Sequence, residues 1–215
     1  MSVATRRVPV RAHARGFTLV EMMAVAAIIA IIAVLAVYGV RRWINSSHIA
    51  EATEMVQAIG GAQEQYRADR GTFANITAAG SLANSDLCPA YVPGAQGTWD
   101  SFNCPRGSTT STSGTGTSTP VANTSWTALN IVASKQLWYS YGTWAGAANT
   151  DPNASPIPQV TMKGVTLNYS AMAGGVQPNP YYAVIARGDL DADGVYATVF
   201  YASFARTTLT DNESE

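Results

Sequence analysis

Apolar residues dominate positions 17–38, and they predict the first element of the chain. Between Phe17 and Tyr38, Glu21 is the only charged residue among 22. A helix of this length would measure roughly 33 Å, which is enough to cross a hydrocarbon core of about 30 Å. A single carboxylate in such a segment is costly unless it meets a cation, so Glu21 is a candidate functional residue. We predict a hydrophobic transmembrane helix over residues 17–42.

The next stretch keeps the helical period but separates an apolar face from a polar one. One stripe recurs at three- and four-residue spacing, as on an amphipathic helix. It consists of Ile44, His48, Ala52, Met55, Ile59, Ala62 and Tyr66. We predict that residues 43–70 continue the same helix and pack this stripe against a sheet. Gly60-Gly61 weakens the helix locally and leaves room for a bend, and Gly71 predicts its C-terminal cap.

Irregular sequence follows the helix and gives way to strand patterns. Residues 71–124 contain both cysteines and the Ser/Thr-rich run 107–119, which cannot bury apolar area and predicts a mobile surface loop. Residues 125–215 favour strands, at 126–132, 136–144, 160–170, 181–186 and 195–204. Both alternating sets of the last strand contain large apolar groups, so we expect both of its faces to be covered. The prediction is an α+β fold, with a long N-terminal helix packed on an antiparallel β-sheet.

Positive charge is concentrated before the apolar run. Arg6, Arg7, Arg11 and Arg15 precede it without any acid, whereas only Arg41 and Arg42 follow it closely. This bias predicts a cytoplasmic N-terminal flank and an exported C-terminal part. Removal of residues 1–16 would change the net charge from −1 to −5. A protein this acidic lacks the basic footprint of a general nucleic-acid-binding protein.

The junction Arg15-Gly16-Phe17-Thr18-Leu19-Val20-Glu21 resembles the cleavage and methylation site of type IV prepilins, the precursors of pilins and pseudopilins. The resemblance implies that a membrane peptidase removes residues 1–16 as a leader by cleaving between Gly16 and Phe17. Phe17 would then be N-methylated, and Glu21 would be the assembly glutamate. The implied partners are the prepilin peptidase/methylase, other pilin subunits and the inner membrane. The implied fold is a long helix on an antiparallel sheet.

Elementary electrostatics gives this arrangement a physical basis. Cleavage would place an α-amine on Phe17, which could neutralise Glu21 of a neighbouring subunit and fix the stagger between helices. An ordinary secretory signal would instead be cleaved after the apolar stretch, at small residues. A plain single-span anchor explains the length and the arginines but not Glu21, unless the glutamate snorkels to the interface.

Two further features suggest chemistry outside the helix. Cys88 and Cys104 predict a disulfide in an oxidising compartment, whereas two distant histidines make a zinc site untenable. Asp189, Asp191 and Asp193, followed by Gly194, match the first half of a calcium loop. Phe200 stands where an EF-hand places its bidentate glutamate, so a plain hairpin turn is the competing interpretation.

The functional hypotheses come from different classes. The leading one is a structural subunit of a type IV pilus, and a pseudopilin of a type II secretion system is its alternative. An enzyme is not predicted, because the sequence has no G-x-S-x-G or H-E-x-x-H motif and His48 is the only histidine beyond the leader. An anchored adhesive or ligand-binding module would use a row of exposed aromatics. The candidates for that row are Trp126, Trp138, Tyr139, Tyr141 and Trp144.

Overall fold

A computed structural model describes residues 16–77, 79–83, 86–90, 93–99, 104, 126–154, 156–205 and 207–212. The chain forms two compact units, Met1–Arg41 and Arg42–Glu215. Residues 1–15 of the predicted leader and the Ser/Thr-rich run 107–119 lie outside the described residues.

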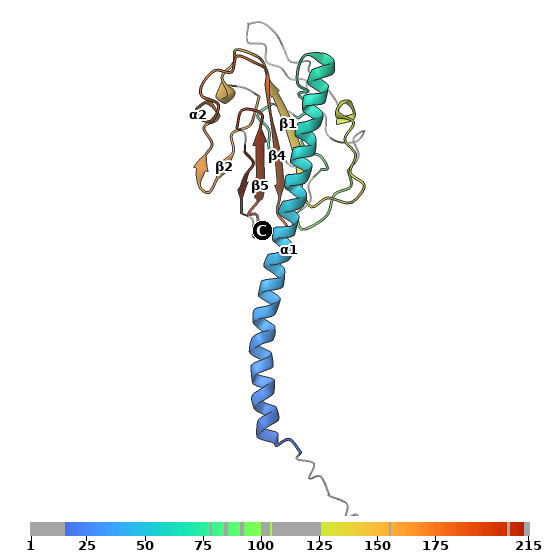
Figure 1. The fold of residues 1–215 in the computed structure, drawn as a ribbon, viewed down its shortest axis with the longest axis vertical. Coiled ribbons are helices and arrows are strands. Elements are labelled where there is room, and N and C mark those ends of the chain that lie inside the picture. The colour runs from blue at the N-terminus through green and yellow to red at the C-terminus, as the bar shows by residue number, and fades with distance from the viewer. Residues whose placement is uncertain are drawn as a thin grey trace, which may run out of the picture. The chain divides into compact units, whose positions relative to one another are not determined.

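Helix α1 spans Leu19–Arg70 and supplies the described helical part of the first unit (Figure 1). Its segment Leu19–Val37 has a mean hydropathy of 2.8, and none of it is buried. Among the described residues, this is the one helical segment that is long and apolar enough to cross a membrane. The Gly71 cap is confirmed, since Gly71 adopts a φ of 77° and its N–H donates to the Arg67 carbonyl at 2.7 Å.

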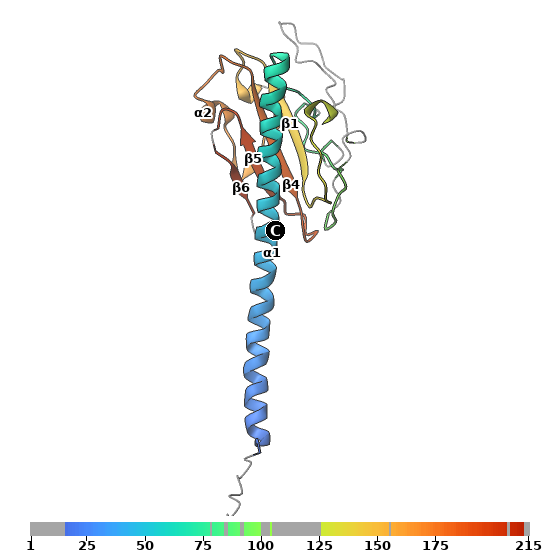
Figure 2. The same ribbon diagram turned by 45° about the vertical axis from the view of Figure 1, so that its right-hand side comes forward.

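The second unit is built around an antiparallel sheet. Its four strands lie in the order β1 (Ser140–Gly146), β4 (Tyr181–Gly188), β5 (Ala197–Ala202) and β6 (Leu209–Asp211). The later part of α1 runs along one face of this sheet (Figure 2). Smaller elements complete the unit: η1 (Trp126–Leu129), η2 (Pro152–Ala154), β2 (Thr161–Met162), β3 (Val165–Thr166) and α2 (Tyr169–Ala173). The predicted α+β architecture is confirmed.

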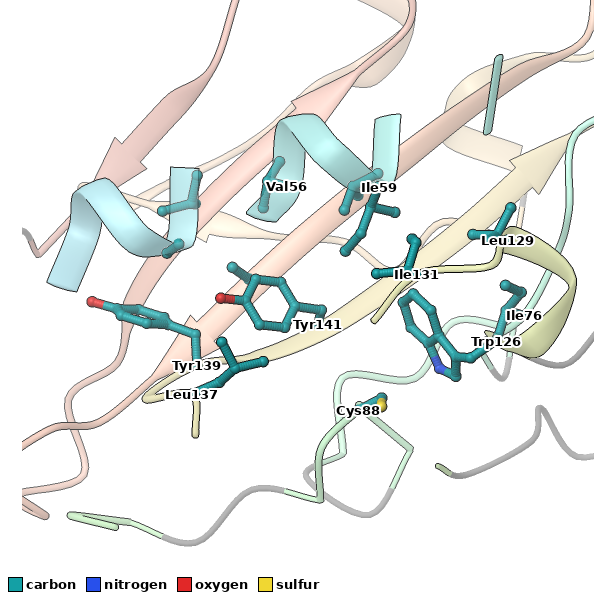
Figure 3. Packing of buried hydrophobic residues seen from close by; sticks show 14 of the residues in the cluster. Val56, Ile59, Ile76, Cys88, Trp126, Leu129, Ile131, Leu137, Tyr139 and Tyr141 are labelled. Carbon is teal, nitrogen blue, oxygen red and sulfur yellow. The ribbon is translucent and has the colours of Figure 1, made fainter. Parts of the chain in front are cut away.

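Both faces of the sheet are buried, as the composition of the last strand predicts. On the α1 side, Val56 and Ile59 of the helix pack with Tyr141 of β1 and with the segment around Trp126 and Leu129 (Figure 3). On the other side a second cluster includes Trp144, Tyr169 and Phe200, with the last two rings stacked at 5.3 Å. Strands covered on both sides carry apolar residues at successive positions, which explains why their sequence lacks a simple alternation.

The buried line of α1 is shifted from the predicted stripe. Ala52, Val56 and Ile59 are fully buried, whereas Ile44 is 41% exposed. The same line includes a polar residue, Gln63, which is also fully buried. Its amide exchanges two hydrogen bonds of 2.8 Å with the backbone of Ala74 and donates a third to Thr143 Oγ1 of β1. Gln63 therefore fastens the helix to both the following loop and the sheet.

Helix α1 continues through Gly60-Gly61 to Arg70 without a break. Gly60 permits a close approach between the helix and the sheet. A Cβ atom there would lie 3.0 Å from Cε1 of Tyr201 and 3.2 Å from the hydroxyl of Tyr182. At Gly61 an added Cβ would meet no atom within 4 Å. The first glycine is thus a packing residue and the second is not.

The early strand predictions are corrected by local turn chemistry. Residues 126–129 form the 3-10 helix η1 rather than a strand, and β1 begins only at Ser140. The predicted strand 160–170 is divided by a tight turn at Lys163 and Gly164, whose φ values are 51° and 74°. Asn168 then caps α2 through its side chain.

The later strands agree better with the prediction, except at the C-terminal end. Strands β4 and β5 fall within or close to the predicted ranges 181–186 and 195–204. The short edge strand β6 was not predicted, since three residues carry too little pattern to show in the sequence.

Candidate functional site: the N-terminal junction of α1

The predicted cleavage point lies in exposed, non-helical chain immediately before α1. Gly16, Phe17 and Thr18 are outside the helix, and Phe17 is 71% exposed. A Cβ added at Gly16 would meet no atom within 4 Å, so nothing in the described chain covers this peptide. A peptide bond in a helix would have to be unwound before a peptidase could hold it. The Gly16–Phe17 bond needs no such unwinding.

Thr18 and Glu21 together form the start of the helix. The Thr18 Oγ1 accepts a hydrogen bond from the Glu21 backbone N–H at 3.2 Å, and the Thr18 carbonyl accepts the N–H of Met22 at 3.1 Å. Thr18 is thus the N-cap, and Glu21 stands at the third helical position, the spacing of a capping box. A carboxylate in the first turn also interacts favourably with the helix dipole.

This geometry gives Glu21 a local role that our sequence reasoning did not include. The signal was present as the pattern Thr18-Leu19-Val20-Glu21 before an apolar run. The cap uses the Glu21 backbone N–H, so it leaves the carboxylate free to meet another charge. Within the described residues 16–40 no second charged side chain exists to neutralise it. A counter-charge for Glu21 must therefore come from an amino terminus or from outside this segment.

The helix that follows the junction is apolar on every side. Ile28, Ile29 and Val34 are 58%, 60% and 70% exposed, and they project in three different directions around the axis. A helix that is apolar all round is normally covered by lipid or by other helices. Among the described residues, the protein's own chain buries none of the span Leu19–Val37.

The predicted disulfide is present in the second unit. Cys88 and Cys104 are bonded, with their Cα atoms 5.1 Å apart, and both are buried. Cys88 also forms an antiparallel bridge with Tyr141, exchanging backbone hydrogen bonds of 2.9 Å and 2.7 Å. The bond therefore ties the irregular region to the edge of the sheet at β1.

The acidic turn brings its three aspartates together. One carboxylate oxygen from each of Asp189, Asp191 and Asp193 lies within 4.8 Å of the others. Asp189 is 2% exposed, and its two oxygens accept the backbone N–H groups of Asp193 and Gly194 at 3.2 Å and 3.0 Å. Asp193 Oδ1 in turn accepts the Val195 N–H at 2.7 Å, which is an ordinary Asx turn and needs no ion. Calcium binding at this turn stays a prediction.

The proposed aromatic platform is wrong. Trp126, Tyr139, Tyr141 and Trp144 are each no more than 1% exposed. Trp138 is half-buried, and its ring lies 4.9 Å from that of His48. Burial lowers the pKa of His48. The negative charge of Glu51 raises this pKa, and the positive charge of Lys135 lowers it. Four of the five aromatics thus belong to the core, so the set cannot present a flat binding surface.

The comparisons with known proteins concern the same junction. Residues 11–37 match a family described as the prokaryotic N-terminal methylation motif. No curated protein and no solved structure matches the chain. The matched segment includes Gly16, Phe17 and Glu21 and most of the exposed apolar span. The match implies processing by a prepilin peptidase and assembly with other subunits, and it fits a single-pass anchor before assembly. The chain thus carries the signal of type IV pilins and pseudopilins, which indicates a structural subunit rather than an enzyme.

Proposed function

We propose that this protein is a structural subunit of a type IV pilus, cleaved between Gly16 and Phe17 and polymerised through the first part of α1. One observation supports the proposal above all others. The methylation motif includes the 19-residue helical segment Leu19–Val37, of which none is buried by its own chain. Lipid would cover this surface in the inner membrane before assembly, and equivalent helices would cover it in the filament.

Glu21 would set the register of that polymer. Cleavage leaves the Phe17 amine one residue before the helix cap and one helical turn from Glu21. In a low-dielectric surrounding, an amine and a carboxylate of neighbouring subunits attract each other strongly, and either one alone is costly. Only a particular axial stagger would satisfy both charges, so the pair would select one arrangement of helices.

The test uses filaments sheared from cells that express the full chain. Mass analysis of the wild-type subunit is expected to show residues 1–16 missing and a methyl group on Phe17. Glu21→Ala is expected to be cleaved normally but absent from filaments. Glu54→Ala, which removes an exposed carboxylate from the later part of the same helix, is the matched control and should assemble. Normal incorporation of Glu21→Ala would refute the register role, and a mature chain that begins elsewhere would refute the whole proposal.

A pseudopilin of a type II secretion system is the second candidate. The acidic turn favours it, because pseudopilins of the major class, which the junction resembles, bind calcium in C-terminal loops, and one carboxylate oxygen from each of the three aspartates lies within 4.8 Å of the others. Deletion of the gene would separate the two functions. Loss of surface filaments with normal secretion supports the pilus, and loss of secretion without loss of surface filaments supports the pseudopilus.

Calcium at the acidic turn has its own test. If calcium binds there, the melting temperature of the purified full chain will rise with calcium chloride and not with magnesium chloride. The double substitution Asp191→Asn with Asp193→Asn should remove that rise, while Asp69→Asn, an exposed aspartate of α1, should keep it. An unchanged melting temperature of the wild-type protein would show that the turn is only structural.

A further inference from the structure

A polar cavity lies on the face of the sheet that α1 does not cover. Its volume is about 270 Å³. The polar residues that line it are Thr161, Arg187, Tyr196, Thr198, Asp211 and Asn212. This volume is just below the roughly 300 Å³ at which small-molecule sites in proteins usually begin, so it suits a small organic ligand.

The strand register builds this cavity around a row of three side chains. Arg187 of β4 pairs with Thr198 of β5, and Thr198 pairs with Asp211 of β6. Residues directly opposite one another in antiparallel strands project on the same face of a sheet. Since neighbouring strands lie about 4.8 Å apart, the Arg187 and Asp211 backbones are roughly 10 Å apart, with a hydroxyl between them.

Both charged groups are held in place by other parts of the unit. The Arg187 guanidinium stacks 3.7 Å above the centre of the Tyr196 ring, and its Nη1 donates to the Leu82 carbonyl at 3.2 Å. Asp211 is 7% exposed, and its two oxygens accept the N–H groups of Lys163 at 2.6 Å and Asn212 at 3.0 Å. Side chains fixed in this way lose little entropy when a ligand arrives.

The two charges do not neutralise each other directly. Among the described residues, the one ion pair within 4.0 Å joins Lys135 to Glu51, on the opposite side of the sheet. Arg187 keeps N–H donors beyond the one bonded to Leu82, and the Asp211 oxygens keep further lone pairs. The cavity thus offers donors at one end, acceptors at the other and hydroxyls between them.

We propose that this cavity binds a small neutral polyhydroxylated molecule of monosaccharide size. Adjacent hydroxyls can donate to Asp211 and at the same time accept from Arg187 and Thr198, which a purely donating or accepting ligand cannot do. An anion would be attracted by Arg187 but repelled by Asp211. A cation would be attracted by Asp211 but repelled by Arg187. The site uses no residue of the N-terminal junction, so it does not depend on polymerisation.

The probes are D-glucose, D-galactose and D-mannose, titrated separately into the purified full chain in a detergent without a sugar headgroup. Saturation-transfer NMR and calorimetry would report binding. Asp211→Asn keeps the shape of the side chain but removes the charge, and we expect it to weaken binding at least tenfold. Thr198→Val should weaken binding several-fold, and Thr207→Val, an exposed threonine outside the cavity, should bind as the wild type does.

The outcomes separate the proposal from its competitors. Binding of one of the sugars that is lost in Asp211→Asn and kept in Thr207→Val supports it. Binding of glycine or acetate but of no sugar would overturn the assignment of ligand class. Equal binding by all variants would place the sugar elsewhere, and no binding of any sugar would overturn the proposal. Arg187→Lys, which keeps the charge but loses the planar stack on Tyr196, provides a second measure of the site.

Discussion

The two parts of α1 have the same backbone structure and opposite surroundings. In the first part, Ile31 and Val34 are 64% and 70% exposed, and in the later part Val56 and Ile59 are fully buried. The first part is apolar on every side, whereas the later part has an apolar line and exposed polar residues such as Gln57 and Glu64. The protein's own sheet buries the apolar surface of the later part. No described residue of the chain buries the apolar surface of the first part.

This contrast shows how one helix can serve two purposes. Burial of apolar side chains in the chain's own sheet stabilises the second unit at about 25 cal/mol per Å² removed from water. The same type of side chain in the first part adds nothing to that unit and is available for lipid or for another subunit. Substitutions along α1 should therefore have effects that depend on which part they fall in.

The largest difference is expected from removing an isoleucine in each part. Ile59→Ala should lower the free energy of unfolding of the second unit by about 2–5 kcal/mol, because it leaves a cavity under the sheet. Ile31→Ala should leave that free energy unchanged. Denaturant unfolding of the full chain in detergent, followed by the fluorescence of the buried tryptophans, measures both. Equal losses in the two variants would contradict the division between the parts.

The next effect concerns the polar residue in the buried line. Gln63→Ala leaves the N–H and the carbonyl of Ala74 without the partners they have now, and each such group costs about 1–3 kcal/mol. We expect a loss of about 2–4 kcal/mol in the same unfolding measurement. Gln57→Ala, at an exposed position of the same helix, is the control and should change stability by less than about 0.5 kcal/mol. If Gln63→Ala leaves the free energy of unfolding unchanged, the hydrogen bonds between Gln63 and Ala74 do not contribute to stability.

A smaller effect separates the two adjacent glycines. Gly60→Val would push a side chain into the Tyr201 ring and should cost about 1–3 kcal/mol. Gly61→Val points into open space and should stay within about 0.5 kcal/mol of the wild type. The same substitution at neighbouring positions thus measures how closely the helix approaches the sheet. If both variants unfold at the same denaturant concentration, the close approach of the helix to Tyr201 at Gly60 does not affect stability.

The smallest effect is a dependence on pH at His48, where the helix meets the loop before β1. Burial beside Trp138 lowers the pKa of His48 below its usual 6.5. The unfolded chain therefore binds a proton more readily than the folded one, so stability falls as the pH drops below about 6.5 and is constant above it. His48→Gln should flatten this part of the stability profile. If the stability of both proteins falls equally as the pH drops below about 6.5, groups other than His48 cause the pH dependence.

The first part of the helix was predictable because its signals are local. The uninterrupted apolar run, Glu21 and Gly16-Phe17 lie within a few residues of one another, and Thr18 completes the cap without help from the rest of the chain. The Cys88–Cys104 bond was also predicted, since only two cysteines exist. The shifted buried line of the later part was not predictable in detail. Which side of an amphipathic helix faces the sheet depends on partners such as Thr143, 80 residues away in the chain.

By itself, the sequence determined the long helix, its change from an all-round apolar surface to a one-sided one, and the junction that carries the methylation motif. Tertiary structure decided that Gln63 is buried, that Gly60 lies against the sheet, and that Trp126, Tyr139, Tyr141 and Trp144 belong to the core. It also decided that Arg187 and Asp211 share one cavity. The reason is physical: helix start and hydropathy depend on neighbours in the sequence, whereas burial and convergence depend on strand register, which joins residues that the sequence keeps apart.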